Sequence, residues 1–265
     1  MDLLTKTIVL RPYVFLFLTA FLAASIVDLG RVRASLFGAL AASVAWIAEF
    51  SSTRSGIPFG LYHYTATTQG QEIFIGNVPL MDPLSFAFLT YGAFCLARVV
   101  LAVRAPSRTA LAVLSGTLMM LLDVVIDPLA VRGDRWFLGR VFYYPDGGAY
   151  FGVPLSNFAG WVLVGTAAVA IYCAVTGDEG VYRTPPRAGI ALYYGVLTFN
   201  LAVTAWIEEW DLLGAGVAIH SVTALALWSL ARTAGAPRPV ATPPVRAAAD
   251  VGYVSSPGRR RAGAL

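Results

Sequence analysis

The side chains with the most chemical promise in this chain are carboxylates that stand inside or at the ends of long apolar segments. Asp123 and Asp127 are four residues apart, so on a helix they share one face. Glu49 and Asn157 stand near the ends of two other apolar segments. An ionised acid deep in hydrocarbon costs about 2.5–3.5 kcal/mol on insertion scales. Carboxylates in such segments are therefore candidates for a functional site.

Further acids lie at segment ends that we expect to meet the same membrane face. Asp82 opens one segment, and Glu208, Glu209 and Asp211 close another. Asp28, at the opposite end of the first segment, is the exception. A helix-end acid can also reach headgroup water without any chemical role. That interpretation fits Glu209 and Asp211 as well as a functional site does.

Aromatic side chains gather near that membrane face as well. An interfacial belt explains any one of the tryptophans taken singly. Together with the acids, they would also suit an apolar ligand that reacts through a cation, because π faces attract positive charge. These tryptophans are Trp46, Trp136, Trp161, Trp206 and Trp210.

Seven long apolar stretches have to position these side chains. The chain has 265 residues, of which 57% are hydrophobic and 13% charged, whereas soluble domains carry about 25% charged residues. Each stretch is close to the roughly 20 residues that a helix needs to cross hydrocarbon, where a helix satisfies its own backbone hydrogen bonds. We therefore predict an all-α, multi-pass integral membrane protein of about seven spans. The stretches are residues 12–29, 34–50, 83–103, 108–128, 153–175, 188–207 and 212–233.

The spans form one expected transmembrane domain, residues 1–234, followed by a tail, residues 235–265. The first stretch lacks a convincing cleavage site and runs almost directly into the second, so we expect it to be retained. The tail is rich in Pro, Ala and Arg and is expected to be disordered. Arginines near helix ends are more numerous on the side of the C-terminus, which predicts a cytoplasmic C-terminus. Basic residues placed in this way set topology and give no sign of nucleic-acid binding.

Two connections on the non-cytoplasmic side resemble each other. Residues 78–83 align with residues 153–158 at an offset of 75 residues. The same offset carries Glu49 to within one residue of Asp123, and both connections contain paired tyrosines. The alignment predicts a duplicated helix–loop–helix unit around one cavity.

Four motifs stand beside these acids and aromatics. They are Glu49 with residues 56–64 (GIPFGLYHY), residues 76–80 (GNVPL), residues 123–128 (DVVIDP) and residues 150–161 (YFGVPLSNFAGW). Together they resemble the membrane hydratases of carotenoid biosynthesis of the CruF type. The last motif is the most specific, because it is long and rich in Gly, Pro, Asn and Trp. The resemblance covers residues 40–165 by motif and the whole membrane region by span layout.

The resemblance implies an enzyme that adds water across the terminal carbon–carbon double bond of an acyclic, lycopene-like carotenoid end. The implied substrate is a carotenoid in the bilayer, and other carotenoid-biosynthesis enzymes are open as partners. Some positions depart from the family pattern. Asn77 replaces an expected Gly, and Trp136-Phe137 replaces an expected Trp-x-Trp. Asp82 precedes Pro83 where an aliphatic residue is usual, so no family role is assigned to Asp82.

Hydrating such an alkene needs an acid that protonates carbon, an environment that tolerates a tertiary cation, and a base that holds the water. We assign the acid to Asp123, the deepest carboxyl, because burial favours the protonated form. Glu49 is the partner that orients or deprotonates the water, and Asn157 positions water or substrate. Asp127 is the third candidate, although Pro128 also allows it a structural role in ending the helix. The aromatic residues expected to contact substrate are Phe59, Tyr62, Tyr64, Tyr150, Trp161 and Trp206.

Other functions stay open on the residues alone. A membrane carotenoid cyclase would share the protonation step and differ in what quenches the cation. A prenyltransferase would hold Mg²⁺ and a diphosphate, but the spans near the acids are almost free of Lys and Arg. A transporter would need acids along a pathway rather than at one end.

A retinal-binding protein is excluded, since it needs a lysine within a span and Lys6 is the only lysine. No nicotinamide, flavin or metal motif is visible in the sequence. His63 and His220 are too few for a histidine-rich metal site. We therefore expect a reaction that uses neither a cofactor nor a metal ion.

Overall fold

The computed structural model describes residues 1–102, 107–177 and 186–233. Most of this part of the chain is helical, and short strands lie in the connections. The helices are α1 (Leu3–Leu10), α2 (Pro12–Leu29), α3 (Arg31–Ser55), α4 (Met81–Leu101), α5 (Arg108–Ala130), α6 (Leu155–Thr176), α7 (Arg187–Trp206) and α8 (Trp210–Thr233). The remaining elements are β1 (His63–Tyr64), β2 (Phe74–Ile75), β3 (Val78–Pro79), β4 (Phe142–Tyr143) and the 3₁₀ turn η2 (Gly133–Arg135). The expected tail, residues 235–265, lies outside the described residues.

Among the described residues, seven helices, α2 to α8, are long and apolar enough to cross a membrane. The predicted all-α integral membrane fold is confirmed. The largest difference from the predicted boundaries is in α3, which runs from Arg31 to Ser55 instead of over residues 34–50, and the ends of α4 to α8 shift by at most two residues. Large apolar side chains remain exposed on the outside of the bundle, as expected of a surface that meets lipid. Among them are Leu16, Val27, Ile47, Leu163, Val175 and Leu225.

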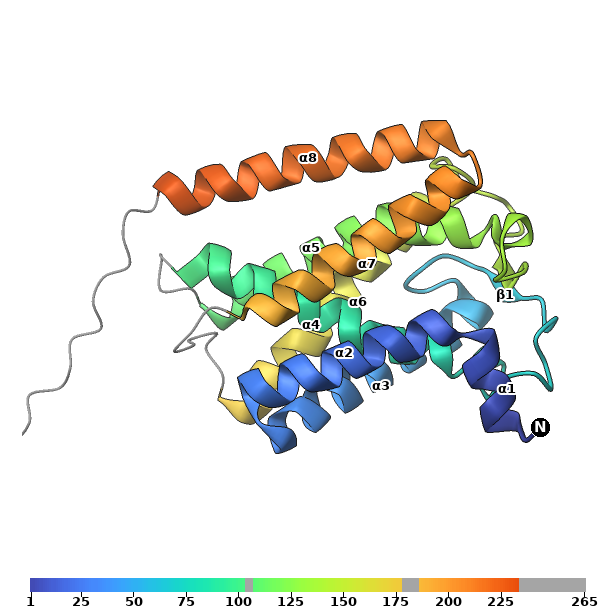
Figure 1. Cartoon of the computed structure of the whole chain (residues 1–265), viewed down its shortest axis with the longest axis horizontal. Coiled ribbons are helices and arrows are strands. Elements are labelled where there is room, and N and C mark those ends of the chain that lie inside the picture. Colours follow the sequence, from blue (N-terminus) through green and yellow to red (C-terminus); the bar gives the residue numbers. More distant parts are fainter. Residues whose placement is uncertain (103–106, 178–185, 234–265) are drawn as a thin grey trace, which may run out of the picture.

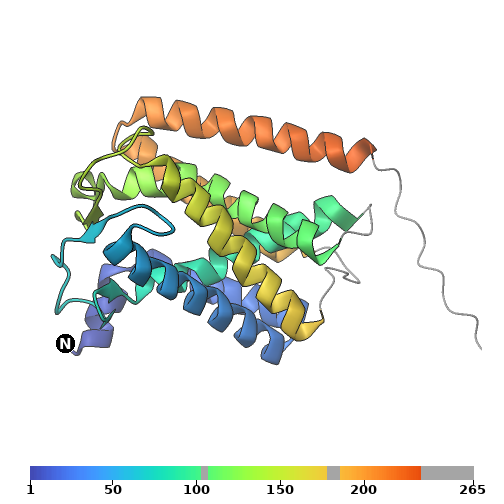
Figure 2. The same cartoon turned by 180° about the vertical axis from the view of Figure 1, so that it is seen from behind.

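Helix α4 lies at the centre of the bundle, and α8 lies at its edge (Figures 1 and 2). Of the apolar, membrane-spanning part of α4, 78% of the residues are buried, whereas only 17% are buried in the corresponding part of α8. The connections that carry the short strands gather at one end of the bundle together with α1 (Figure 1). This end, called the loop end below, is where α3 and α5 finish and where α4 and α6 begin.

Local sequence explains where these helices start and stop. Pro12 takes the first helical position of α2, where its missing N–H is not needed. Helix α3 ends at Gly56, which has a φ of 76° and donates its N–H to the carbonyl of Ser52. That left-handed conformation favours glycine because it has no Cβ. The chain therefore leaves α3 sharply and enters the first long loop.

Helices α5 and α6 approach each other closely through small residues. A Cβ atom at Gly116 would lie 2.4 Å from the hydroxyl of Thr166, and one at Gly165 would lie 2.9 Å from the Cα of Gly116. Small residues at such crossings let two backbones come together. The packing of α5 on α6 sets Asp127, near the end of α5, against Asn157, in the first turn of α6.

The two long loops are joined to each other over the loop end. Strand β1 of the first loop pairs antiparallel with β4 of the second, with His63 opposite Tyr143 and Tyr64 opposite Phe142. Strands β2 and β3 form a second small pair within the first loop. The two helix–loop–helix units that the sequence alignment relates are therefore neighbours in space, with their loops in direct contact.

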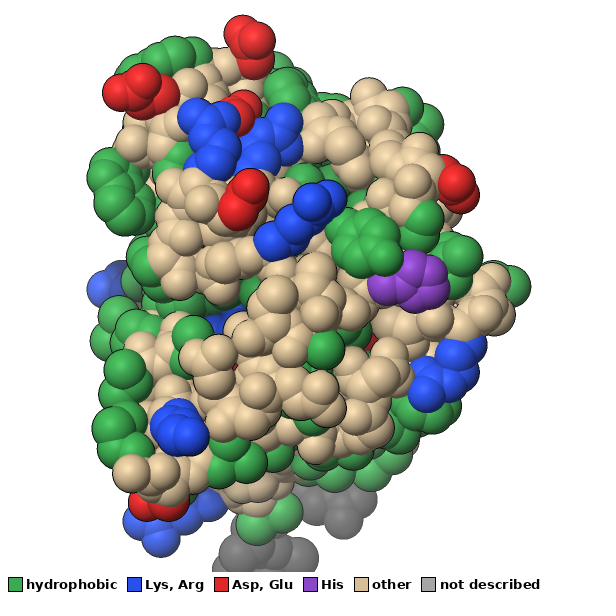
Figure 3. Space-filling view, turned by 90° about the vertical axis from the view of Figure 1, so that its right-hand side faces the viewer, with side chains coloured by type: hydrophobic (Ala, Val, Ile, Leu, Met, Phe, Trp, Pro, Cys, Tyr) green, Lys and Arg blue, Asp and Glu red, His purple; other side chains and the backbone are tan. Residues whose placement is uncertain are grey.

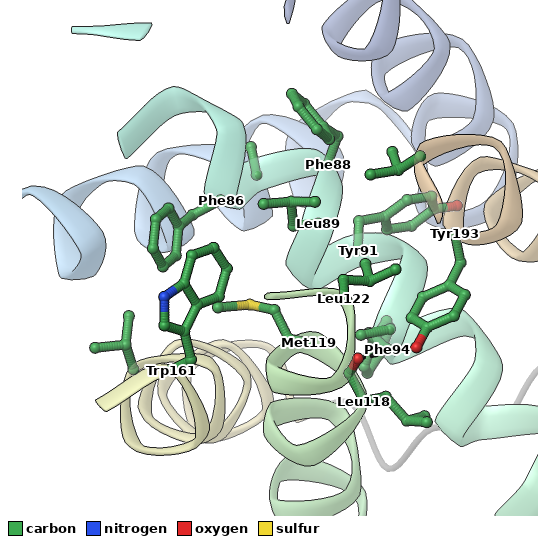
Figure 4. Packing of buried hydrophobic residues seen from close by; sticks show 14 of the residues in the cluster. Phe86, Phe88, Leu89, Tyr91, Phe94, Leu118, Met119, Leu122, Trp161 and Tyr193 are labelled. Atoms are coloured by element: carbon green, nitrogen blue, oxygen red, sulfur yellow. Dashed lines mark hydrogen bonds between the residues drawn. The ribbon is translucent and has the colours of Figure 1, made fainter. Parts of the chain in front are cut away.

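A continuous apolar core runs away from the loop end along α4. Figure 4 shows Phe86 and Trp161 facing each other at one side of this core, with Met119 beside them. The rings of Phe86 and Trp161 stack with centroids 4.5 Å apart and planes inclined by 21°. The core therefore begins at an aromatic wall, and that wall belongs to the cavity described below.

Candidate active site

A cavity of about 150 Å³ lies at the loop end, between the helices and under the two long loops. Each helix from α2 to α7 contributes to its lining. Three carboxyl groups, of Glu49, Asp82 and Asp127, and the amide of Asn157 line it. The four groups come from four different spans, α3, α4, α5 and α6, so only the packed bundle brings them together.

Glu49 lies inside α3, more than a turn before the helix ends, and is almost fully buried. The hydroxyl of Tyr64, on β1, donates a hydrogen bond to Oε2 of Glu49 at 3.0 Å. Burial raises the pKa of Tyr64 well above its usual value, and the charge of Glu49 adds to that rise. The phenol therefore stays protonated and remains a donor to Glu49.

Asp127 occupies a matching position in the second unit. The hydroxyl of Tyr144 lies 3.5 Å from Oδ2 of Asp127, and burial raises the pKa of Tyr144 above its usual value as well. These tyrosine contacts relate Glu49 to Asp127, whereas the sequence alignment relates Glu49 to Asp123. The structure thus repeats an acid–tyrosine pair once in each helix–loop–helix unit.

Asn157 connects Asp127 with Asp123. Its amide nitrogen Nδ2 donates to Oδ2 of Asp123 at 2.7 Å and to Oδ2 of Asp127 at 2.8 Å. A side-chain amide has two N–H groups, so one asparagine can hold both carboxyls at once. The i, i+4 pair on α5 and the amide on α6 form a single hydrogen-bonded cluster.

Asp123 is fully buried and does not line the cavity. It lies behind Asn157, and its Oδ1 has no hydrogen-bond partner among the described residues. The sequence assigned the acid to Asp123, but Asp127 is the member of the pair that lines the cavity. The depth of a carboxyl along its helix does not by itself show whether it can contact a ligand in the cavity.

Asp127 does not end its helix. Helix α5 continues through Pro128 to Ala130, so the structural role that the sequence allowed for Asp127, ending the span, does not apply. The proline is tolerated within the last turn, and Arg132 donates to its carbonyl oxygen at 2.8 Å. Asp127 is left facing the cavity with its hydrogen bonds from Asn157 and Tyr144.

The cavity walls are largely aromatic. Four of the six aromatic residues that the sequence indicated line the cavity, and two do not. Trp206 is 65% exposed on the outside of α7, and Tyr150 packs against Phe151 and Phe158. The geometry gives no support to a contact of these two with a reacting group in the cavity. The four that line it are Phe59, Tyr62, Tyr64 and Trp161.

Several aromatic lining residues were not singled out from the sequence. Phe86 stacks on Trp161, and Tyr13 and Phe17 of α2 contact Phe199 of α7 at ring distances of 5.4 and 5.6 Å. No motif marks these positions, because an aromatic residue in an apolar span looks like any other core residue. Their role in the cavity depends on how α2, α4 and α7 pack.

The sequence is similar to those of carotenoid biosynthesis proteins. A profile of carotenoid biosynthesis proteins matches residues 10–227. The chain belongs to that family. This carotenoid biosynthesis protein is also 31% identical to a bisanhydrobacterioruberin hydratase from Haloarcula japonica, over 229 residues that cover 81% of the chain and 74% of the relative. No solved structure matches it.

Family membership confirms the resemblance that the motifs predicted. The matched range includes Glu49, Asp82, Asp127 and Asn157. All residues that line the cavity, from Arg11 to Asn200, lie within the matched range of this carotenoid biosynthesis protein.

One charged residue of the cavity was missed by sequence reasoning. Arg11 precedes the first span and was not singled out from the sequence, but it is only 2% exposed and lines the cavity. It forms an ion pair with Glu72 at 2.8 Å and lies 3.9 Å from Asp82. The only sign of this charged pair in the sequence was that Asp82 departs from the family pattern, and that departure did not identify Arg11 as its partner.

The outer rim of the loop end carries ordinary ion pairs. Arg132 and Arg135 both pair with Glu209, which agrees with a helix-end role for that acid. Figure 3, a view onto the loop end, shows basic and acidic side chains side by side on this surface. At the opposite end of the bundle, Asp28 pairs with Arg98 at 2.5 Å. Asp28, the one acid that the sequence placed away from the loop end, therefore has a structural partner.

Among the described residues, no three His, Cys, Asp or Glu side chains are arranged to hold a metal ion. The expectation of a metal-free reaction stays a prediction that a chelation experiment has to test.

Proposed function

We propose that this chain is a carotenoid hydratase that adds water to the terminal 1',2' double bond of an acyclic, lycopene-like end group. The observation that carries the proposal is a cavity at one membrane end in which Asp127, Glu49 and Asn157 face aromatic walls. Family membership supplies the substrate class, and the hydratase from Haloarcula japonica supplies the reaction type. The choice of the 1',2' bond rests on the motif resemblance.

The size of the cavity suits the end of an isoprenoid chain. A protein cavity of about 150 Å³ with apolar walls can bind benzene, and the cavity here has about the same volume. A branched terminal alkene of a few carbons fits such a space, whereas a whole carotenoid does not. The rest of the polyene therefore extends away from the cavity, between helices or into lipid.

The first chemical step is protonation of the less substituted alkene carbon. We assign the proton to Asp127, because it is the carboxyl of the Asp123–Asn157–Asp127 cluster that reaches the cavity. A positioned general acid contributes about 10²–10⁴-fold to rate. The new C–H bond leaves a tertiary cation, which the faces of Phe86 and Trp161 can stabilise.

Capture of the cation by water completes the reaction. Glu49, held by Tyr64, can accept a hydrogen bond from the water and orient its oxygen toward the cation. Formation of the C–O bond and loss of one proton give the tertiary alcohol. The net change is the addition of one water molecule, so the reaction consumes no electrons and needs no redox cofactor.

Expression in cells that accumulate lycopene, followed by mass spectrometry of the pigments, tests the proposal. A gain of one water per reacted end is the expected result. Unchanged mass with a shifted absorption spectrum would assign the chain to cyclases, and unchanged pigment would favour a transporter. In isolated membranes EDTA should leave hydration intact. Activity that is lost on chelation and restored by Mg²⁺ would instead favour a prenyltransferase.

A further inference from the structure

The corner of the cavity beside α2 contains a buried arginine whose geometry is fixed from one side. Nε and Nη2 of Arg11 donate to the two carboxylate oxygens of Glu72, at 3.1 and 2.8 Å. Both residues are at most 2% exposed. Such a two-point pair holds the plane of the guanidinium. Burial lowers the pKa of Arg11, but Asp82 and Glu72 outweigh that effect and raise it above its ordinary value.

The remaining nitrogen of this guanidinium points toward Asp82. Nη1 of Arg11 lies 3.9 Å from Oδ1 of Asp82 and 3.4 Å from the hydroxyl of Tyr13. The separation of 3.9 Å is too wide for a direct hydrogen bond and is suited to a water shared by both groups. Asp82 is also the more open of the two partners, with 27% of its side chain exposed compared with 2% for Arg11.

The three cavity carboxyls differ in their surroundings. Of the salt bridges between described residues, only the one from Arg11 reaches a cavity carboxyl, and it reaches Asp82. Glu49 and Asp127 instead receive hydrogen bonds from neutral groups, the hydroxyls of Tyr64 and Tyr144 and the amide of Asn157. Like charges in one small space oppose one another's ionisation, and a nearby cation favours the charged form of its neighbour.

We propose that Asp82 is the catalytic base that takes the proton from the attacking water, and that Arg11 is the positioning residue that keeps Asp82 anionic. As the water oxygen bonds to the tertiary carbon, one O–H bond breaks and its proton passes to Asp82. A further water then carries that proton back to Asp127, which had given its own proton to the alkene. The inference rests on the proposed hydration and adds a division of labour among the carboxyls.

Deuterium exchange separates the two steps. Membranes with lycopene are incubated in D₂O buffer, and the pigments are analysed by mass spectrometry. In the wild type, the hydrated end carries deuterium on carbon. Asp82→Asn should reduce hydration by at least about 10²-fold, while recovered substrate still gains deuterium, because protonation by Asp127 is reversible. Asp127→Asn should lose both signals.

A paired substitution separates positioning from folding. Arg11→Met alone leaves Glu72 buried without a partner, which destabilises a protein. The double variant Arg11→Met with Glu72→Met removes both charges, so Glu72 no longer leaves an unpaired charge in the interior. It should accumulate in membranes like the wild type, exchange deuterium, and still hydrate at least about tenfold more slowly. Arg54→Met is the matched control, since Arg54 bonds to Asn77 at the rim, and it should hydrate normally.

Each outcome decides between the alternatives. The inference is overturned if Asp82→Asn hydrates at the wild-type rate, or if it loses deuterium exchange together with hydration, which would make Asp82 the acid. Full hydration in the double variant would show that Arg11 only holds Glu72. A wild type that neither hydrates nor exchanges deuterium would remove the proposed function itself, whatever the variants do.

Discussion

Two carboxyls of the cavity each meet a tyrosine hydroxyl, Glu49 through Tyr64 and Asp127 through Tyr144. Both acids face the cavity, and neither has a salt-bridge partner among the described residues. Glu49→Gln and Asp127→Asn keep the shape of each side chain and remove the ionisable proton. We expect hydration to fall by at least about 10²-fold in each variant, measured as hydroxylated carotenoid per amount of inserted protein.

Asp146→Asn is the matched control for these changes. Asp146 is exposed in the second long loop and lies outside the cavity. It should behave like the wild type. Near-normal hydration in both Glu49→Gln and Asp127→Asn would move the acid to Asp123 or Asp82 and would contradict the assignment made above.

Tyr64 tests whether orientation of Glu49 matters apart from its charge. Tyr64→Phe removes one hydroxyl and keeps the ring that packs against Tyr62. A neutral hydrogen bond is worth about 0.5–1.5 kcal/mol, so hydration should fall by about 2- to 13-fold. Tyr143→Phe changes the neighbouring loop at a residue that does not line the cavity and should have no effect. Equal losses in both variants would point to general damage to the loops.

At the scale of elements, the contact of α5 with α6 holds the acids against their asparagine. Gly116→Ala would set a Cβ 2.4 Å from the carbonyl oxygen of Val162 and from the hydroxyl of Thr166. Overpacking of this kind costs about 1–3 kcal/mol. We expect a lower melting temperature of the solubilised protein. Hydration should be slower as well, because Asn157 on α6 would move away from Asp127.

Gly195→Ala is the control for that helix variant. A Cβ at Gly195, in α7, meets nothing within 4 Å, and alanine favours helix over glycine by about 0.8–1.0 kcal/mol. Its melting temperature should therefore be unchanged or slightly higher. A Gly116→Ala protein as stable as Gly195→Ala would mean that α5 and α6 can separate without harm to the site.

At the scale of the whole molecule, the loop end and its cavity lie at one membrane face. The arginine distribution predicts that this face is non-cytoplasmic and that the C-terminus is cytoplasmic. Alkaline phosphatase fused after residue 234 should therefore stay inactive in intact bacteria. The same enzyme inserted at Gly70, where a Cβ would meet nothing within 4 Å, should be active. The reverse result would place the site on the cytoplasmic side.

The seven spans and the membrane end at which the acids meet could be predicted from the amino-acid order alone. The spans follow from the length of the apolar segments, because an apolar helix of about 20 residues crosses hydrocarbon. The common membrane end follows from the order of the spans, because the end of one span and the start of the next lie at the same face. Four motifs were also enough to recognise the family. None of this depends on how the helices are rotated about their axes.

Which side chains reach the cavity depends on how the helices pack against one another. Spacing showed that Asp123 and Asp127 share a face, but the packing of α6 on α5 determined that Asn157 covers one and leaves the other open. Arg11 meets Glu72 through a loop 61 residues away in the chain, and no local pattern links such partners. Helix rotation and loop paths depend on long-range packing, so side-chain access could not be predicted from the sequence.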